Sequence, residues 1–188
     1  MILEKDYKKE SLHNLTLIFV RHSDTAFGNH GHLSLDGVTH ARQLEKRIED
    51  ILHHTYGNES KPACLRISCS DYTRTTDTMR ELRDIGGKSI IEEWTATSRD
   101  EVMRYGPVHM LDAITRYAFC FEAKVVVVIT NHGDTCAVLA ETAYKLLTQT
   151  SIQLESSAYA YGYYIAHNTR TIGYVGWDGC RDNILDCA

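Results

Sequence analysis

The apolar residues of this chain follow two patterns, short uninterrupted runs and longer stretches with helical spacing. Residues 15–20 (LTLIFV) form a run rich in β-formers that ends abruptly at a charged pair. The run is too brief for a helix and predicts a buried strand. From Gly37 to about Gly57, apolar residues recur every three or four positions between charged ones, which predicts an amphipathic helix.

The same two patterns continue to the end of the chain. Further strands are expected over 65–69, 89–91, 125–130, 158–165 and 170–175, and further helices over 71–85, 101–121 and 137–147. Asp71 offers an N-cap for the first of these helices, Gly86 and Gly87 end it, and Gly106 and Pro107 interrupt the second. Residues 125–130 (VVVVIT) do not alternate, which predicts a strand buried on both faces with parallel neighbours.

Strands that alternate with helices predict an α/β fold, a three-layer sandwich with a mostly parallel central sheet flanked by helices. A length of 188 residues favours a single domain over residues 1–188, large enough to bury a core without disulfides or metals. In such sheets ligands bind where strands end and helices begin. Chemistry is therefore expected at the carboxyl ends of the strands.

The composition excludes several classes of protein. A formal charge of −5 argues against a nucleic-acid or membrane-surface partner, whose binding protein would be basic. The charged N-terminus lacks the apolar stretch of a signal peptide, and no window approaches the roughly 18 apolar residues of a membrane span, which predicts a cytoplasmic protein. The six cysteines include no CxxC pair, so reduced and mostly buried thiols are expected.

Arginines and histidines follow three of the predicted strands. Arg21 and His22 come directly after the first strand, Arg74 follows the second, and His132 follows residues 125–130. A single histidine after a strand is more often structural, but two histidines and two arginines at one sheet edge form a compact cationic cup. The guanidinium fork matches phosphate oxygens bidentately, so the cup indicates a phosphate site.

Four segments in this order, RHSDTAFGN, LSLDG, SCSDYTRTTDT and VVVVITNHGDT, resemble the histidine phosphatase (phosphoglycerate mutase-like) superfamily. The match spans residues 15–147. Its strongest elements are the Arg-His pair after a strand, the pattern formed by Ser70, Arg74 and Thr78, and the His-Gly pair after a late strand. The chain has no room for a large insertion between Glu93 and Val125, so it is more similar to the small bacterial phosphohistidine phosphatases than to the mutases.

The resemblance implies a metal-independent phosphatase without a cofactor, acting on a phosphorylated protein or a small phosphometabolite. His22 would be the nucleophile that takes the phosphoryl group, while Arg21, Arg74 and His132 would hold its oxygens. A neutral imidazole is a capable nucleophile because its reference pKa is about 6.5, and phosphoryl transfer otherwise asks mainly for positioning and positive charge. Further contacts to phosphate or substrate are expected from Ser23, Asn29, Ser70 and Gly133.

The proton donor to the leaving group is expected soon after a short strand, where Glu92 and Glu93 stand together. Glu93 is favoured because it fits the apolar-x-Glu pattern that begins at Ile91, whereas Glu92 would point to the other side of an extended segment. Asp24, two residues past His22, is a competing acid. Alternatively, both glutamates are solvated surface charges.

Three departures from the family's pattern bear on function. Ser23 stands where the family usually has Gly, Asn29 lies one place later than the customary Asn, and His40 replaces a Gln. They leave open a second function, a catalytically weak phosphate-recognition module. A phosphoglycerate mutase is disfavoured, because a mutase must retain and reorient its intermediate in a more enclosed site.

The remaining histidines and tyrosines have ordinary structural interpretations. His30 and His32 alternate and His53 and His54 are adjacent, but without acidic or cysteine ligands at a recognised spacing they do not indicate a metal site. The tyrosines near the C-terminus alternate as a strand face would, which favours core packing over ligand stacking: Tyr159, Tyr161, Tyr163, Tyr164 and Tyr174.

Overall fold

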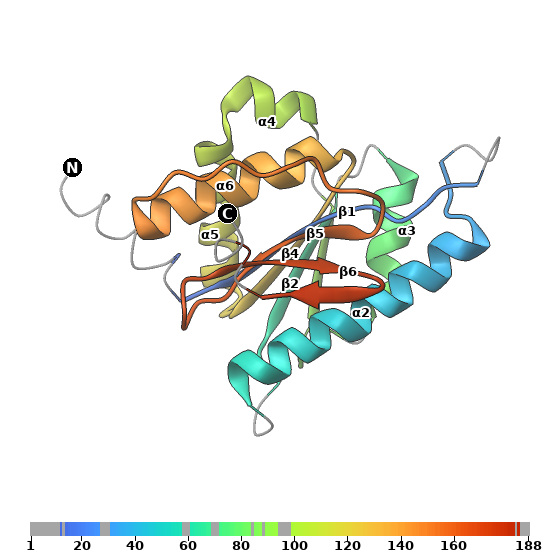
Figure 1. Ribbon diagram of the computed structural model, residues 1–188, viewed down its shortest axis with the longest axis horizontal. Helices are drawn as coiled ribbons and strands as arrows, with labels where there is room; N and C mark the ends of the chain where they lie inside the picture. Colours follow the sequence, from blue (N-terminus) through green and yellow to red (C-terminus); the bar gives the residue numbers. More distant parts are fainter. Residues whose placement is uncertain are drawn as a thin grey trace.

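A seven-stranded sheet lies at the centre of the molecule with helices on both faces (Figure 1). The computed structural model describes residues 12, 14–26, 31–57, 61–68, 72–83, 85–87, 89–93, 99–182 and 184. The strands are β1 (Thr16–Arg21), β2 (Cys64–Ser68), β3 (Ser89–Glu93), β4 (Val125–Thr130), β5 (Tyr161–Ile165), β6 (Ile172–Gly176) and β7 (Gly179–Arg181). The helices are α2 (Leu35–Tyr56), α3 (Thr73–Glu81), α4 (Arg99–Tyr105), α5 (Pro107–Cys120) and α6 (Gly133–Thr148). The predicted α/β fold with helices on both faces of the sheet is confirmed.

The sheet is half parallel and half antiparallel. Its strands lie in the order β3-β2-β4-β1-β5-β6-β7. The first four pair in parallel, and β5, β6 and β7 extend the β1 edge in antiparallel pairs. The expectation of a mostly parallel sheet is therefore only partly right. Residues 161–181 form three successive strands with no helix between them, and short connections of this kind produce antiparallel neighbours.

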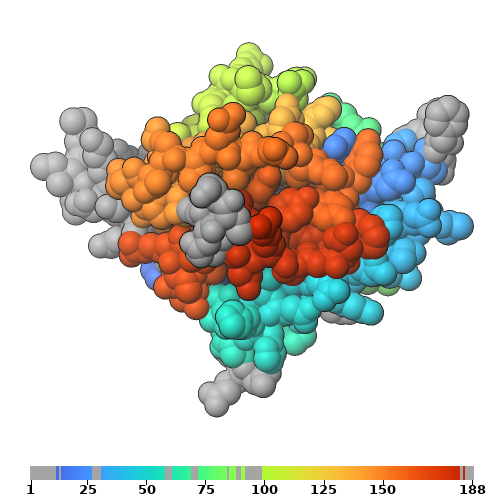
Figure 2. Space-filling model, viewed as in Figure 1, coloured from blue at the N-terminus to red at the C-terminus, as the bar shows by residue number. Residues whose placement is uncertain are grey.

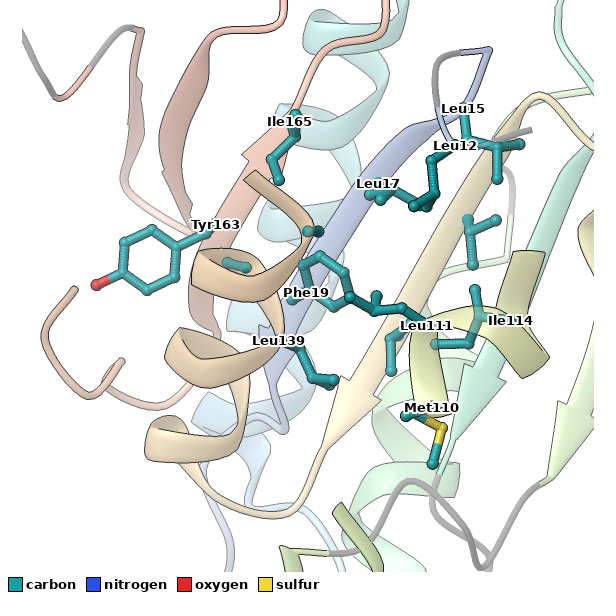
Figure 3. Packing of buried hydrophobic residues seen from close by; sticks show 14 of the residues in the cluster. Leu12, Leu15, Leu17, Phe19, Met110, Leu111, Ile114, Leu139, Tyr163 and Ile165 are labelled. Carbon is teal, nitrogen blue, oxygen red and sulfur yellow. The ribbon is translucent and has the colours of Figure 1, made fainter. Parts of the chain in front are cut away.

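Two apolar cores hold the sheet, one on each face. The core beneath α5 and α6 includes Phe19, Leu111 and Leu139 (Figure 3). The core beneath α2 and α3 includes Ile18 and Ile48. Every residue of β4 is buried between these two layers, as its uninterrupted apolar run predicted. Burying each such side chain contributes about 1.5–3 kcal/mol to the stability of the fold. The residues at the ends of the strands are therefore attached to a tightly packed core.

The helices that follow β1 and β4 pack on opposite faces of the sheet. α2 follows β1 and packs on one core, whereas α6 follows β4 and packs on the other. Because β1 and β4 are neighbours, their carboxyl ends form a topological switch point. Ligands bind at such points in α/β sheets. Arg21 and His22 at the end of β1, and His132 after β4, follow the two strands that form this one.

α3 differs from its prediction at both ends. It begins after Tyr72, whereas the expected N-cap Asp71 lies outside the described residues. It ends before the two glycines expected to stop it. The buried guanidinium of Arg66 donates to the carbonyl oxygens of Met79 and Leu82 and so satisfies the last turn.

The cysteines are less uniformly buried than expected. Four are free thiols in the described part of the chain; Cys64 and Cys136 are buried, whereas Cys120 and Cys180 are exposed. The expectation of mostly buried thiols therefore fails for half of them. The other two, Cys69 and Cys187, lie outside the described residues.

α2 lies within two residues of its predicted bounds, whereas α6 begins at Gly133, four residues before the predicted start at 137. The predicted break between α4 and α5 is confirmed at Gly106, where the backbone turns with φ 86°. Across the described residues, no helix combines the length and the apolar character that crossing a membrane requires.

Candidate active site

The main chain of His22 is held on both sides where β1 ends. Its N–H donates to the carbonyl oxygen of Thr130 at 3.0 Å, and its carbonyl oxygen accepts from the N–H of Ala160 at 3.2 Å. The imidazole Nδ1 lies 2.6 Å from the carbonyl oxygen of Ser23. A carbonyl can only accept, so Nδ1 carries the proton and Nε2 keeps a lone pair. The backbone therefore fixes both the position and the tautomer of His22.

The surroundings of His22 keep its imidazole neutral. The residue is only 2% exposed. Burial is the largest cause of a pKa lowered from 6.5 to about 4; the hydrogen bond to Ser23 opposes it, and the charges of Arg74, Arg21 and His132 support it. At neutral pH His22 is an uncharged base with a lone pair on Nε2, which is the form a nucleophile needs.

Two arginines near His22 have donors that no described residue uses. Arg21 ends β1 and donates from Nη1 to the carbonyl oxygen of Ser157 at 3.3 Å. Arg74 lies in the first turn of α3, with Cζ 4.9 Å from the ring centre of Tyr72. The Nε atoms of both arginines are buried without a hydrogen-bond partner among the described residues. Leaving a buried donor unpaired costs about 1–3 kcal/mol, so both groups favour a bound anion.

A hydrogen-bonded bridge joins the end of β1 to α3. Thr78 Oγ1 accepts from the N–H of Ser23 at 2.9 Å and donates to the carbonyl oxygen of Arg74 at 2.8 Å. Ser23 itself is 0% exposed, and its hydroxyl donates to the carbonyl oxygen of Gly37 at 2.6 Å. This hydroxyl binds the first turn of α2, and a contact between Ser23 and phosphate stays a prediction.

His132 and Gly133 lie where β4 passes into α6. His132 is the N-cap of α6, and its charge is one of the causes that lower the pKa of His22. Residues 149–160, called the return segment here, run back over α6 to β5, partly on the surface (Figures 1 and 2). A Cβ added to Gly133 would lie 2.0 Å from the carbonyl oxygen of Ser157. The glycine is thus required by the close approach of the return segment.

Tyr159, on the return segment, belongs to the site although core packing was expected of it. Its ring centre lies 3.9 Å from Cζ of Arg21 and 5.1 Å from the ring centre of His22. It is 40% exposed, whereas Tyr163 and Tyr164 are each 5% exposed and lie in the cores as predicted. The alternating tyrosines are therefore not one uniform face.

Asn131 is a second residue at this edge that was not predicted. It stands between β4 and His132 and is 1% exposed. Neither Nδ2 nor Oδ1 of its amide has a hydrogen-bond partner within the described part of the chain. A polar residue directly before the His-Gly pair was the feature of the sequence that could have identified it.

The remaining predicted residues are placed only in part. β3 extends to Glu93, whose backbone is in register with Ser68 of the neighbouring β2, so it reaches the same sheet edge. The side chains of both candidate glutamates, like Asn29 and Ser70, lie outside what the structure describes. Asp24 is half-buried, and its Oδ1 accepts from the N–H of Thr25 at 2.9 Å. The identity of the proton donor stays a prediction.

The other histidines take part in local contacts. His32 Nδ1 lies 2.7 Å from a carboxylate oxygen of Asp77. His40 stacks on Trp177 with ring centres 4.1 Å apart. In the portion of the chain that the structure describes, no three His, Cys, Asp or Glu side chains are grouped so that they could hold a metal ion.

Comparison with known proteins gives matches among solved structures only. No protein-family model matches the chain, and no curated protein matches it. Mycobacterial hydrolase 1 is 14% identical, with 90% of this chain and 97% of that chain covered and a TM-score of 0.47. A phosphoglycerate mutase from Bacillus anthracis str. Sterne is 14% identical, with 92% and 93% covered and a TM-score of 0.46. A protein assigned as the phosphohistidine phosphatase SixA from Agrobacterium tumefaciens is 11% identical, with 90% and 94% covered and a TM-score of 0.43.

The close contact at Gly133 predicts a specific effect of Gly133→Ala. The added methyl group must displace the return segment, which we expect to lower the free energy of unfolding by roughly 1–3 kcal/mol. Lifting that segment admits water to His22, so the pKa of its imidazole should rise from about 4 toward 6.5. Urea unfolding and an NMR titration of the histidines measure both effects. Gly179→Ala is the control, because no atom lies within 4 Å of its added Cβ; equal behaviour of the two variants would contradict the prediction.

Proposed function

We propose that this protein is a metal-independent phosphatase of the histidine phosphatase type, which works through a covalent phosphohistidine on His22. Its substrate is a phosphorylated protein, such as a phosphohistidine protein, or a small phosphoester. The observation that carries the proposal is a neutral His22 with a lone pair on Nε2, beside two arginines with unpaired buried donors.

The charges around His22 suit phosphoryl transfer. The transferred group carries negative charge on three equatorial oxygens, and Arg21, Arg74 and His132 supply donors and positive charge near the attacking nitrogen. Fixed donors of this kind stabilise developing charge without having to reorganise during the reaction. The same positive charges disfavour protonation of His22, so they also preserve its lone pair.

The proposed reaction has two steps. Nε2 of His22 attacks phosphorus, the bond from phosphorus to the leaving oxygen or nitrogen breaks, and the leaving group takes a proton from a general acid. Water then attacks the phosphohistidine and gives a proton to the conjugate base of the general acid, the phosphorus–Nε2 bond breaks, and inorganic phosphate and neutral His22 are released. Covalent catalysis of this type divides one difficult displacement into two easier ones. We assign the general acid to Glu93, with Glu92 and Asp24 as alternatives.

The catalytically weak alternative was motivated by Ser23 and by the displaced Asn29, and of these two the structure describes only Ser23. A serine in place of the usual glycine would reduce activity if its side chain occupied the phosphate position. Its hydroxyl instead donates to the carbonyl oxygen of Gly37, and the residue is fully buried. An active phosphatase is therefore the better interpretation of this site.

His22→Ala should abolish turnover of an aryl phosphate while the protein still folds, because the apolar strand before it is unchanged. The assay contains EDTA, and activity should be indifferent to it. Quenching wild-type protein with labelled substrate should trap phosphate in a bond that survives alkali and is lost in acid. His54→Ala, in the last turn of α2, is the matched control and should retain full activity. Label on serine, or near wild-type activity in His22→Ala, would overturn the assignment.

Arg74→Lys should lower kcat by about 10-fold or more, because lysine keeps the charge but loses the planar fork, and a lost charged contact is worth roughly 2 kcal/mol. Arg80→Lys is the control on the same helix, since Arg80 is exposed and pairs with Asp77 at 3.4 Å. Steady-state kinetics of both variants make the comparison. Wild-type kinetics in Arg74→Lys would place this arginine outside the phosphate site.

Glu93→Gln tests the general acid through the leaving group. A general acid matters most when the leaving oxygen is strongly basic. Alkyl phosphate hydrolysis should therefore slow severely, aryl phosphate hydrolysis much less, and phosphohistidine hydrolysis least. The ratio of wild-type to mutant kcat/KM over the three substrates is the measurement, and Glu92→Gln is measured beside it to test the adjacent alternative acid. A uniform loss would make Glu93 a structural residue, and no loss on alkyl phosphates would transfer the role to Asp24 or Glu92.

A further inference from the structure

Tyr159 combines contact with two site residues and partial exposure. Its ring lies against the guanidinium of Arg21, with Cζ 3.9 Å from the ring centre. The imidazole of His22 is tilted by 49° to the same ring at 5.1 Å. With 40% of the residue exposed, its burial in the core does not account for its position.

The backbone next to Tyr159 is strained and firmly held. Ala160 has φ 56°, a left-handed conformation that costs energy for a residue with a Cβ. Its N–H donates to the carbonyl oxygen of His22, and its own carbonyl oxygen accepts from Trp177. The N–H of Tyr161 donates to the carbonyl oxygen of Ala158, which closes the turn. Strain of this kind persists where the surrounding structure holds it and is frequent at functional sites.

We propose that Tyr159 is a positioning residue for phosphoryl transfer: its ring fixes the plane of the Arg21 guanidinium and excludes water from the imidazole of His22. This inference rests on the proposed phosphatase function. The ring touches no reacting atom in the proposal and acts only through these two residues.

The contacts of Arg21 explain how the ring would orient it. Nη1 is held by the carbonyl oxygen of Ser157, one face of the guanidinium is covered by Tyr159, and Nε has no partner among the described residues. With one nitrogen and one face held, the group keeps little rotational freedom. A cation held over an aromatic ring is stabilised more strongly when water is excluded. The Nε side is left to bind the phosphoryl oxygens.

The cover over His22 also predicts a pH effect. The charged groups that act on its imidazole are Arg21 from β1, Arg74 from α3 and His132 at the start of α6. All three favour the neutral form, and none is removed by a substitution at Tyr159. Loss of the ring admits water, weakens the effect of burial and raises the pKa of His22 toward 6.5. Protonation then removes the lone pair at a higher pH, so the acid limb of kcat/KM moves upward.

The test compares Tyr159→Leu with Tyr159→Phe, which keeps the ring and loses the hydroxyl. We expect Tyr159→Leu to lower kcat/KM on an aryl phosphate by about 10-fold at pH 7.5, and to move the acid limb up by about one pH unit. Tyr159→Phe should remain within about twofold of wild type. Tyr117→Leu is the matched control, because Tyr117 is 38% exposed and lies on α5.

A second measurement does not depend on turnover. NMR titration of the labelled imidazoles should place the pKa of His22 higher in Tyr159→Leu than in wild type, Tyr159→Phe or Tyr117→Leu. The inference is overturned if the wild type is active and Tyr159→Leu has the same kcat/KM. It is also overturned if Tyr159→Phe loses as much kcat/KM as Tyr159→Leu, or if the pKa of His22 is the same in Tyr159→Leu as in wild type. An inactive wild type in which the His22 shift still occurs would instead contradict the proposed function.

Discussion

The two backbone hydrogen bonds of His22 are the constraint on which the rest of the site depends. One ties the residue to the end of β4 and the other to the return segment, so His22 continues the ladder although β1 ends at Arg21. The parallel register of β1 and β4 brings Arg21 opposite Thr130, so His22 and His132 follow neighbouring strands at the same edge of the sheet. The burial that keeps the imidazole neutral follows from the same packing.

Much of this arrangement could be predicted because it depends on local pattern and on one general rule of α/β sheets. The run VVVVIT identified β4 because only a strand buried on both faces has no polar alternation. Arg21, His22 and His132 were placed together because parallel strands end at one edge. Ser34, the N-cap of α2, and the short β7 were not predicted, since neither has a strong periodic pattern around it.

The contacts that were not predicted depend on segments of irregular backbone. Tyr159 contacts Arg21 from a turn in which Ala160 adopts a left-handed conformation, and no alternation of apolar residues encodes that turn. The hydrogen bond from the Ser23 hydroxyl to the carbonyl oxygen of Gly37 was not predicted either, because the motif that contains Ser23 does not specify the path of the chain at Gly37. The antiparallel half of the sheet was also not predicted, because the direction of its strands depends on short connections that contain no helix.

The hydrogen bond between Nδ1 of His22 and its neighbour's carbonyl oxygen has a chemical consequence for any group the imidazole accepts. Only the nitrogen remote from the main chain can form a new bond, so a phosphorylated His22 would be the tele isomer and not the pros isomer. The carbonyl group of Ser23 thus selects one of the two isomers before a substrate binds. The regiochemistry of the reaction would be a property of the folded backbone.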